Sequence, residues 1–234
     1  ADVYHYDLYG KRDFKYNFLS DNNLKSVNWN KLEYSEPNYF FVKKDFSEIE
    51  SYENSFKTNE LFNIVNSGIQ TKRDKLNIHF LEDDAKNTLN FLKEKSKIEI
   101  INKYELPKDG RDWELNLAIK DISNNDVVIF KEQYRPFDYR YSFYTGNSKG
   151  IVAYPRNIIS KHFINKENFA ICLMKQFFQD VAYNHCLITN VLVDERTMYS
   201  NRGGTYVLPM YLYQDENSLT NERTPNLNLE IVKE

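Results

Sequence analysis

The 234-residue chain is 41% hydrophobic and 15% aromatic, with only 7 Gly and 6 Pro, which excludes a disordered or linker-rich polypeptide. Its formal net charge of −3 excludes a uniformly basic nucleic-acid-binding protein, and its two isolated cysteines exclude a disulfide scaffold or a cysteine-bound zinc site. No stretch approaches the roughly 20 apolar residues of a membrane span, and the first residues lack the pattern of a signal peptide. We expect a cytoplasmic protein that does not enter a membrane, folded as a single domain over residues 1–234.

The first part of the chain predicts one strand, one helix, a second strand and a long second helix. Aromatic residues alternate at the start and predict the first strand, and this abrupt beginning leads us to expect a piece of a longer polypeptide. The spacing of Phe14 and Phe18 predicts a helix that ends near residues 20–23. A strand is expected over residues 38–46, and a helix over residues 47–68.

Two further helices precede the strongest strand signal of the sequence. Residues 83–96 carry acids in their first turn and lysines in their last, as the helix dipole favours, and residues 113–122 predict the next helix. Four apolar residues in a row within residues 126–134 are typical of a strand. That strand leads directly into an unusual aromatic and basic stretch.

The second part of the chain predicts strands over residues 169–176, 186–194 and 205–213. The polar tail over residues 214–234 is expected to fray. Strands and helices interleave without a regular βαβ order, so we expect an α+β fold with a mixed β-sheet and several flanking helices.

Motifs of the common catalytic and cofactor sites do not occur in the sequence. No phosphate-binding loop, dinucleotide-binding glycine motif, HExxH or GxSxG is found, and the four histidines are scattered. The acidic pair Asp83–Asp84 is explained by the start of a helix, and the pair Asp194–Glu195 by a strand end that meets water. We therefore predict no catalytic residue, no metal site and no cofactor in this chain.

The stretch from Tyr134 to Arg156 holds seven aromatic residues, four basic residues and one acid. Residues 130–202 carry ten Lys and Arg against six Asp and Glu, whereas the segments on both sides of them are acidic. Tyrosine and arginine are favoured at recognition surfaces, and arginine also binds guanine edges and phosphates. Two interpretations stay open: a surface that binds DNA, or tyrosines that pack a sheet face while Arg135 and Asp138 pair locally.

Four blocks then occur in a familiar order: GIQTKRD at 68–74, AIKDI at 118–122, YRPFDYRYSFYTG at 134–146 and YVLPMYLY at 206–213. Together they resemble the C-terminal specificity (target recognition) domain of Type ISP restriction-modification enzymes and related bacterial adenine-specific DNA methyltransferase–helicase proteins. The resemblance spans about residues 4–213. It implies a domain that recognises a short asymmetric sequence in double-stranded DNA, for phage defence.

The resemblance also implies a division of labour within a longer polypeptide. Adenine methylation and S-adenosylmethionine binding would belong to a methyltransferase domain outside this chain, so the expected partners are double-stranded DNA and that domain. The alternative is a non-catalytic interaction domain that docks onto other domains of the same enzyme.

Carried over by position, the resemblance implies that Lys72, Arg73 and Asp74 lie at a loop facing the DNA or the methyltransferase domain. It implies that Arg135, Arg140, Tyr144, Lys149 and Arg156 lie on or near the DNA cleft. Lys161, a cation just beyond the basic stretch, completes the expected DNA-binding residues, which are Lys72, Arg73, Arg135, Arg140, Tyr144, Lys149, Arg156 and Lys161. Three residues of the central block are expected to be architectural, because Pro136 fixes a turn, Phe137 is buried and Asp138 holds a neighbouring arginine. Base-reading residues are expected between the blocks, in segments such as 145–165 and 175–202.

Overall fold

The computed structural model describes residues 2–34, 36, 38–174, 185–199, 203–214 and 222–233. The chain divides into two compact units, residues 1–56 and residues 57–234. That the two function as one domain stays a prediction.

The unit of residues 1–56 is built on a short antiparallel ribbon and a helix. Strand β1 (Val3–His5) pairs with β2 (Asn30–Leu32), and α1 (Arg12–Asp21) lies between them in sequence, as predicted. The Tyr6 ring stacks on Phe18 at 5.7 Å between ring centroids. None of the α1 residues is buried, so this unit presents many of its aromatic side chains at its surface.

Two predictions for residues 38–68 are wrong. The described residues of 38–46 form no strand, since they pair with no neighbouring backbone that could satisfy a strand's hydrogen bonds. The single helix expected over 47–68 is instead α2 (Ile49–Glu53), α3 (Thr58–Leu61) and the strand β3 (Asn66–Ser67). The Ser55 hydroxyl bonds the Ser51 carbonyl at 2.9 Å, and such local side-chain bonds compete with helix continuation.

The unit of residues 57–234 contains two main sheets. Four strands follow the order β3-β9-β6-β7, and three follow the order β5-β4-β8. Their bounds are β4 (Val128–Arg135), β5 (Asp138–Tyr144), β6 (Ala170–Met174), β7 (Cys186–Thr189), β8 (Leu192–Val193) and β9 (Thr205–Pro209). β8 runs parallel to β4, and the other pairs are antiparallel.

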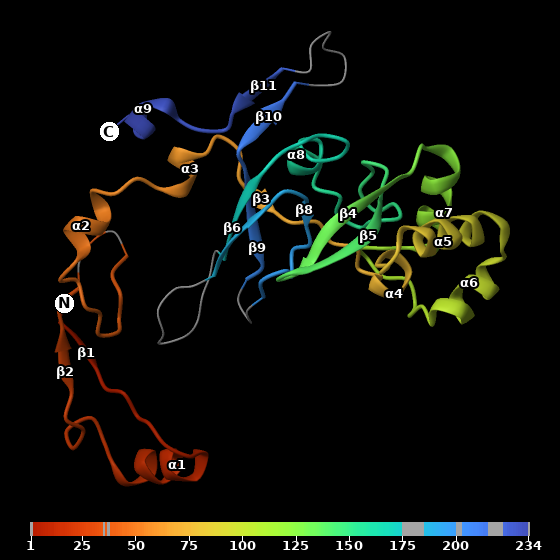
Figure 1. Ribbon diagram of the computed structural model, residues 1–234. Coiled ribbons are helices and arrows are strands. Elements are labelled where there is room, and N and C mark those ends of the chain that lie inside the picture. Colours follow the sequence, from red (N-terminus) through yellow and green to blue (C-terminus); the bar gives the residue numbers. More distant parts are fainter. Residues whose placement is uncertain are drawn as a thin grey trace. The chain divides into compact units, whose positions relative to one another are not determined.

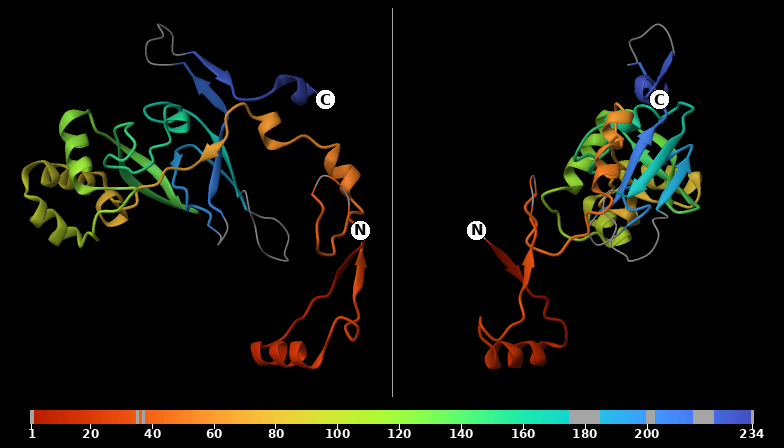
Figure 2. Two further views of the ribbon diagram at one scale, coloured as in Figure 1. Left: turned by 180° about the vertical axis from the view of Figure 1, so that it is seen from behind. Right: turned by 90° about the vertical axis from the view of Figure 1, so that its left-hand side faces the viewer.

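Helices gather at one end of this unit, around the β4–β5 hairpin, as Figures 1 and 2 show. They are α4 (Asp74–Asn77), α5 (Glu82–Glu94), α6 (Lys97–Tyr104) and α7 (Leu115–Asn124), while α8 (Asn157–Ser160) lies nearer the four-stranded sheet. The predicted helices over 83–96 and 113–122 are confirmed as α5 and α7. The mixed α+β fold expected from the sequence is confirmed.

The buried hydrophobic side chains of the described residues form two clusters. One includes Leu92, Trp113 and Phe143 and joins the helices to the hairpin. The other includes Ile69, Leu192 and Val207 and joins the two sheets. The hairpin contributes Phe143 to the first cluster and Phe130 to the second. It is therefore packed on both sides and supports the loops at the surface.

Two of the predicted strands, over residues 186–194 and 205–213, are each divided into two shorter strands that pair with different neighbours. The strand expected over 205–213 is β9 followed by β10 (Tyr211–Tyr213), because Pro209 has no N–H and the Met210 N–H bonds Phe169 at 2.7 Å. The strand over 186–194 is divided into β7 and β8 by a turn in which the Thr189 hydroxyl accepts the Val191 N–H at 3.2 Å. The strand over 169–176 is confirmed to Met174, and residues 175–176 lie outside the described residues.

The prediction that the polar tail frays is wrong for its described residues 222–233. Strand β11 (Arg223–Pro225) pairs with β10, and α9 (Leu229–Lys233) follows. Asn226 is fully buried and its amide donates to the carbonyls of Ile64 and Pro209 at 2.8 Å each. A polar side chain can therefore anchor the tail, because its hydrogen bonds replace those lost to water.

Candidate functional site

The aromatic and basic stretch forms the β4–β5 hairpin, whose register ends at the pair Arg135↔Asp138 and leaves Pro136 and Phe137 as the turn. Phe137 has a left-handed φ of 62°, as a type II turn requires after a proline. The turn expected at Pro136 is confirmed. The prediction that Phe137 is buried is wrong, because the residue is 84% exposed at the tip of the hairpin.

Arg135 forms an ion pair with a residue from another strand. Its Nη1 lies 2.9 Å from Asp194 Oδ1, since β8 runs parallel to β4 and ends beside it. The local pairing of Arg135 with Asp138 is therefore wrong. Asp138 instead accepts a hydrogen bond from Arg140 Nη2 at 2.8 Å, which confirms the expectation that it holds a neighbouring arginine.

Asp194 is 5% exposed, so the prediction that it meets water at a strand end is wrong. The strand end faces β4 rather than solvent. Burial raises the pKa of Asp194 to about 6, against the opposing effects of the hydrogen bond from the Arg196 N–H and of the Arg135 charge. Asp194 therefore holds a buried turn together rather than facing a ligand as a free acid.

The segment that carries Lys72 and Arg73 is tied to β4 through Asp74. The Tyr134 hydroxyl donates to Asp74 Oδ2 at 2.8 Å, and the Thr71 hydroxyl donates to the other carboxylate oxygen. Burial, followed by this hydrogen bond to Asp74, raises the pKa of Tyr134 to about 12. The tyrosine thus remains a donor at neutral pH and keeps the segment in place.

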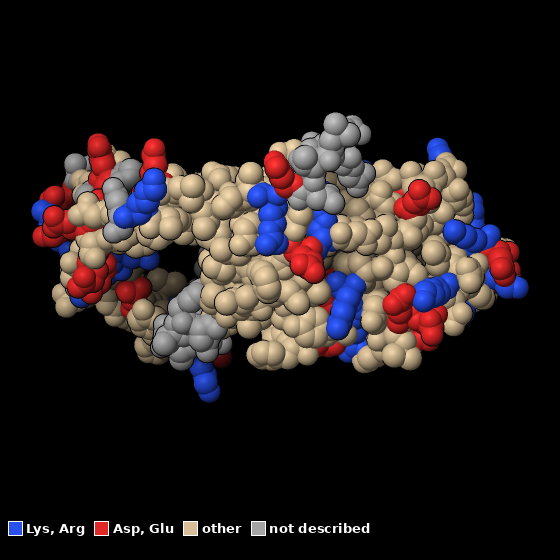
Figure 3. All heavy atoms as spheres, turned by 45° about the horizontal axis from the view of Figure 1, so that its top comes forward, with Lys and Arg blue, Asp and Glu red and all other residues tan. Residues whose placement is uncertain are grey.

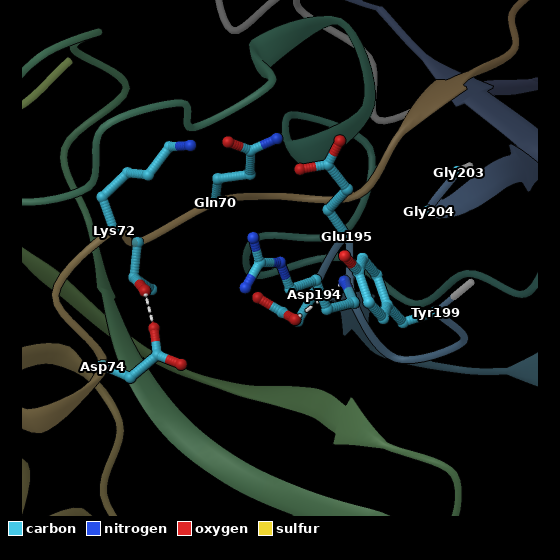
Figure 4. A pocket seen from close by; sticks show the side chains of 10 residues that line it. Gln70, Lys72, Asp74, Asp194, Glu195, Tyr199, Gly203 and Gly204 are labelled. Carbon is cyan, nitrogen blue, oxygen red and sulfur yellow. Dashed lines mark hydrogen bonds between the residues drawn. The ribbon is translucent and has the colours of Figure 1, made fainter. Parts of the chain in front are cut away.

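A cleft of about 540 Å³ opens between this segment and the turn that follows β8. Figure 4 shows the side chains of Gln70, Lys72 and Glu195 extending toward one side of it. The lining residues are Gln70, Thr71, Lys72, Asp74, Asp194, Glu195, Arg196, Tyr199, Gly203 and Gly204. Of the expected DNA-binding residues, only Lys72 lines the cleft.

Three cations of the expected set gather beside this cleft around two aromatic rings. Lys72 Nζ lies 5.7 Å and Arg156 Cζ 5.1 Å from the centroid of the Tyr154 ring. Arg73 Cζ lies 4.8 Å from the Trp113 ring. We call Lys72, Arg73 and Arg156 the cation cluster.

The cation cluster is only weakly neutralised. Lys72 Nζ lies 3.9 Å from a carboxylate oxygen of Asp112, and among the described residues neither Arg73 nor Arg156 takes part in an ion pair. Lys72 and Arg156 both have left-handed backbones, with φ of 63° and 52°. Strained, non-glycine backbone of this kind often marks functional surfaces.

The loop that carries Lys149 is organised by a residue that sequence reasoning missed as a site residue. Asp121 of α7 is 7% exposed and accepts hydrogen bonds from the Thr145 hydroxyl at 2.7 Å, the Asn147 amide at 2.8 Å and the Ile151 N–H at 2.9 Å. The AIKDI block containing Asp121 was the available signal. Lys149 itself is exposed at the tip of this loop.

Other expected residues lie apart from the cation cluster or are engaged in packing. The Arg140 side chain is only 14% exposed, and its Cζ lies 3.2 Å from the Phe80 ring centroid. The Tyr144 hydroxyl donates to Asn157 at 3.2 Å, and Lys161 is exposed just after α8. The structure thus groups three of the eight expected residues and gives Arg135 and Arg140 structural contacts.

The surface charge is mixed. On the face shown in Figure 3, Lys and Arg side chains lie next to Asp and Glu side chains, with broad uncharged areas between them. A ligand held at such a surface would be recognised by the placement of individual groups rather than by a continuous basic sheet.

Within the ranges that the structure describes, no helix is long and apolar enough to cross a membrane. No group of three or more His, Cys, Asp and Glu side chains in those ranges is placed to hold a metal ion. That the chain has no catalytic residue and binds no metal or cofactor stays a prediction.

The chain is an α+β domain with a polar cleft between two of its segments. The family model of the Type ISP C-terminal specificity domain matches residues 60–234. The chain therefore belongs to the Type ISP C-terminal specificity domain family, which confirms the resemblance inferred from the four sequence blocks. A search of curated protein sequences finds no match.

Three solved structures share the fold. A nuclease-deletion mutant of the Type ISP restriction-modification enzyme LlaGI, in complex with a DNA substrate mimic, matches with a TM-score of 0.60 and 19% identity over 97% of this chain and 23% of that chain. The DrdV–DNA complex matches with a TM-score of 0.61 and 14% identity over 99% of this chain and 24% of that chain. The ATP-dependent Type ISP enzyme LlaBIII bound to DNA matches with a TM-score of 0.53 and 19% identity over 88% of this chain and 14% of that chain. The chain thus spans less than a quarter of each of these relatives.

Proposed function

We propose that this chain binds double-stranded DNA and supplies the sequence specificity of a bacterial restriction-modification enzyme that acts in the cytoplasm. Membership of the specificity-domain family and the DNA complexes of the three structural relatives support this function. In this chain, the observation that carries it is the cation cluster beside a polar cleft.

Each part of the surface has a distinct task in this proposal. The cation cluster contacts phosphates through the exposed Lys72 and the partly exposed Arg73 and Arg156. Cations on a fixed backbone neutralise phosphate charge and set the register of the protein on the duplex. Lys149 and Lys161, both exposed, extend these contacts along the loop and past α8. Arg135 and Arg140 hold the hairpin in shape rather than touching DNA.

The reaction itself would take place outside this chain. A methyltransferase domain of the parent polypeptide would bind S-adenosylmethionine and methylate an adenine in the recognised sequence, after the base is flipped out of the helix. The role of residues 57–234 is to hold the duplex so that this adenine lies at that domain.

The salt dependence of binding tests the phosphate contacts. In the full-length enzyme, Lys72→Ala and Arg156→Ala should each weaken binding of every duplex alike and reduce the slope of log affinity against log salt by about 1. Lys93→Ala, on the exposed face of α5, is the matched control and should leave the slope unchanged. Wild-type slopes in both variants would contradict the assignment.

Methylation mapping tests the function as a whole. Genomic DNA from cells making the full-length enzyme should carry methylated adenine in one asymmetric sequence, and deletion of residues 57–234 should abolish it. Replacing these residues with the corresponding domain of a relative should change the methylated sequence. Unaltered modification after the deletion would overturn the proposal.

A second candidate function rests on the unit of residues 1–56. Its exposed aromatic side chains, including Tyr9 at 77%, Phe14 at 55% and Tyr16 at 59% exposure, suit docking onto another domain of the same enzyme. Docking of this kind depends little on salt, so the slope measurement distinguishes it from phosphate binding.

A further inference from the structure

Hydrogen bonds within the protein hold the backbone of the turn that follows β8. Every backbone N–H from Asp194 to Met198 is hydrogen-bonded. The N–H groups of Asp194, Glu195 and Thr197 donate to carbonyls at 3.1, 2.8 and 3.0 Å. The Arg196 N–H donates to Asp194 Oδ1 at 2.9 Å, and the Met198 N–H donates to the Thr205 hydroxyl at 2.7 Å. Since the Asp194, Thr197 and Met198 side chains are buried, this turn is held firmly against the sheets.

Two glycines allow neighbouring backbone to pack closely against the same turn. A Cβ on Gly68 would lie 2.4 Å from the Val193 carbonyl oxygen, and a Cβ on Gly204 would lie 2.6 Å from the Glu195 carbonyl oxygen. No side chain fits at these distances, so the backbone approaches on both sides only because glycine stands there. The turn is thus fixed from both directions before any ligand binds.

The two remaining side chains of the turn are directed to the cleft. Glu195 and Arg196 line it, and among the described residues neither side chain takes part in a hydrogen bond or an ion pair, although Arg196 Cζ lies 5.3 Å from the Tyr199 ring. Gln70 extends toward the same side of the cleft as Glu195 (Figure 4), and both its backbone groups are bonded to Tyr154 at 3.1 and 3.0 Å. Three polar groups therefore project from rigid backbone without a partner in the described protein.

The charges of the cleft decide which part of a duplex these groups suit. Asp74 and Glu195 both line it, and their carboxyl groups make it a poor site for phosphate. A base edge differs, because cytosine and adenine present amino donors to a carboxylate or an amide, and guanine presents two acceptors to a guanidinium. Gln, Glu and Arg are the side-chain types that read these edges.

We propose that Gln70, Glu195 and Arg196 read base edges in the major groove and set the sequence specificity of this domain. This inference rests on the proposed function in DNA binding. The rigid turn gives specificity because its side chains cannot move away from a wrong base. A charged or amide group then faces a base edge with which it forms no hydrogen bond, and this costs binding free energy.

The test compares modified sequences, not modification levels. Full-length enzymes carrying Gln70→Ala, Glu195→Gln or Arg196→Gln are expressed, and their methylated sites are mapped across the genome. In parallel, the duplexes that each variant binds from a randomised pool are sequenced, which also reports on a variant that binds DNA without methylating it. In each variant, the preference for the correct base over the other bases should fall about 10-fold at one position of the recognised sequence. The preferences at the other positions should stay unchanged. Lys72→Ala is the matched cleft control and should keep the sequence while lowering affinity.

The outcomes separate the two proposals. Variants that select the wild-type sequence at every position, with modification unchanged or uniformly lowered, would overturn the base-reading assignment and leave DNA binding intact. A wild-type enzyme that selects no sequence would overturn both.

Discussion

Glu132 is a fully buried carboxyl group on the central strand β4. Neither of its carboxyl oxygens has a hydrogen-bond partner in the part of the chain that the structure describes. Burial, with the nearby negative charges of Asp194 and Asp74, raises the pKa of Glu132 well above its ordinary value. A buried acid of this kind makes stability depend on pH.

The sign of that dependence follows from proton binding. Between the ordinary pKa of 4.5 and the raised folded-state pKa, the folded protein holds more protons than the unfolded chain, so stability falls as pH rises through this window. Glu132→Gln cannot ionise and escapes this fall. We expect the free energy of unfolding of the variant, relative to wild type, to increase from pH 4 to pH 8 in urea titrations.

An exposed glutamate provides the comparison for this measurement. Glu94→Gln at the end of α5 removes one solvent-facing carboxyl group and is measured alongside as the exposed counterpart. If the Glu132→Gln difference were equal at both pH values, the carboxyl group would not titrate differently in the folded and unfolded states.

At the scale of elements, α7 and the loop over residues 145–151 act as one piece through Asp121. Gly150 belongs to the same piece, because a Cβ there would lie 2.1 Å from Asp121 Oδ2. The helix therefore positions the loop that carries Lys149.

Asp121→Ala should destabilise the protein by about 3 kcal/mol, because it leaves several polar groups of the loop, including the buried Ile151 N–H, without an acceptor. Denaturant unfolding measures the loss, and limited proteolysis should detect faster cleavage within residues 145–151. Asp126→Ala, an exposed acid just after α7, should change stability little. A loss as small as that of the control would show that Asp121 does not hold the loop.

The turn of the β4–β5 hairpin tests backbone strain at Phe137. Alanine has a Cβ and keeps the cost of the left-handed conformation, whereas glycine removes it. We expect Phe137→Gly to be more stable than Phe137→Ala by about 1 kcal/mol in denaturant unfolding. Equal stability of the two variants would mean that the turn relaxes when the phenyl ring is removed.

At the scale of the whole molecule, both core clusters lie within residues 57–234. Among the described residues of 1–56, Leu32 is the one buried hydrophobic side chain. The larger unit should therefore fold by itself, since apolar burial is the main stabilising contribution.

A chain of residues 57–234 should unfold cooperatively, with a Tm within about 4 °C of that of the 234-residue chain. Differential scanning calorimetry checks this, with the 1–56 chain measured alongside and expected to show no cooperative transition. A broad, non-cooperative transition for 57–234 would show that its core needs the first unit.

Local sequence signals predicted the elements whose stability is local. The acids and lysines at the ends of α5, the apolar run of β4 and the proline of the hairpin turn each act within a few residues, so the sequence alone determined these elements. The four ordered motif blocks likewise indicated the family, which the family model confirms over residues 60–234.

Only the tertiary structure decided which side chains from distant parts of the sequence contact one another. Arg135 and Asp194 are 59 positions apart, and their pairing depends on β8 lying parallel to β4, which no local pattern encodes. Gln70 and Arg196 reach one cleft because Ile69 forms a parallel bridge with Asp194. Local propensities act over a few residues, whereas a site is assembled by packing between distant strands, so the sequence determined the kind of domain and the fold determined which of its side chains meet.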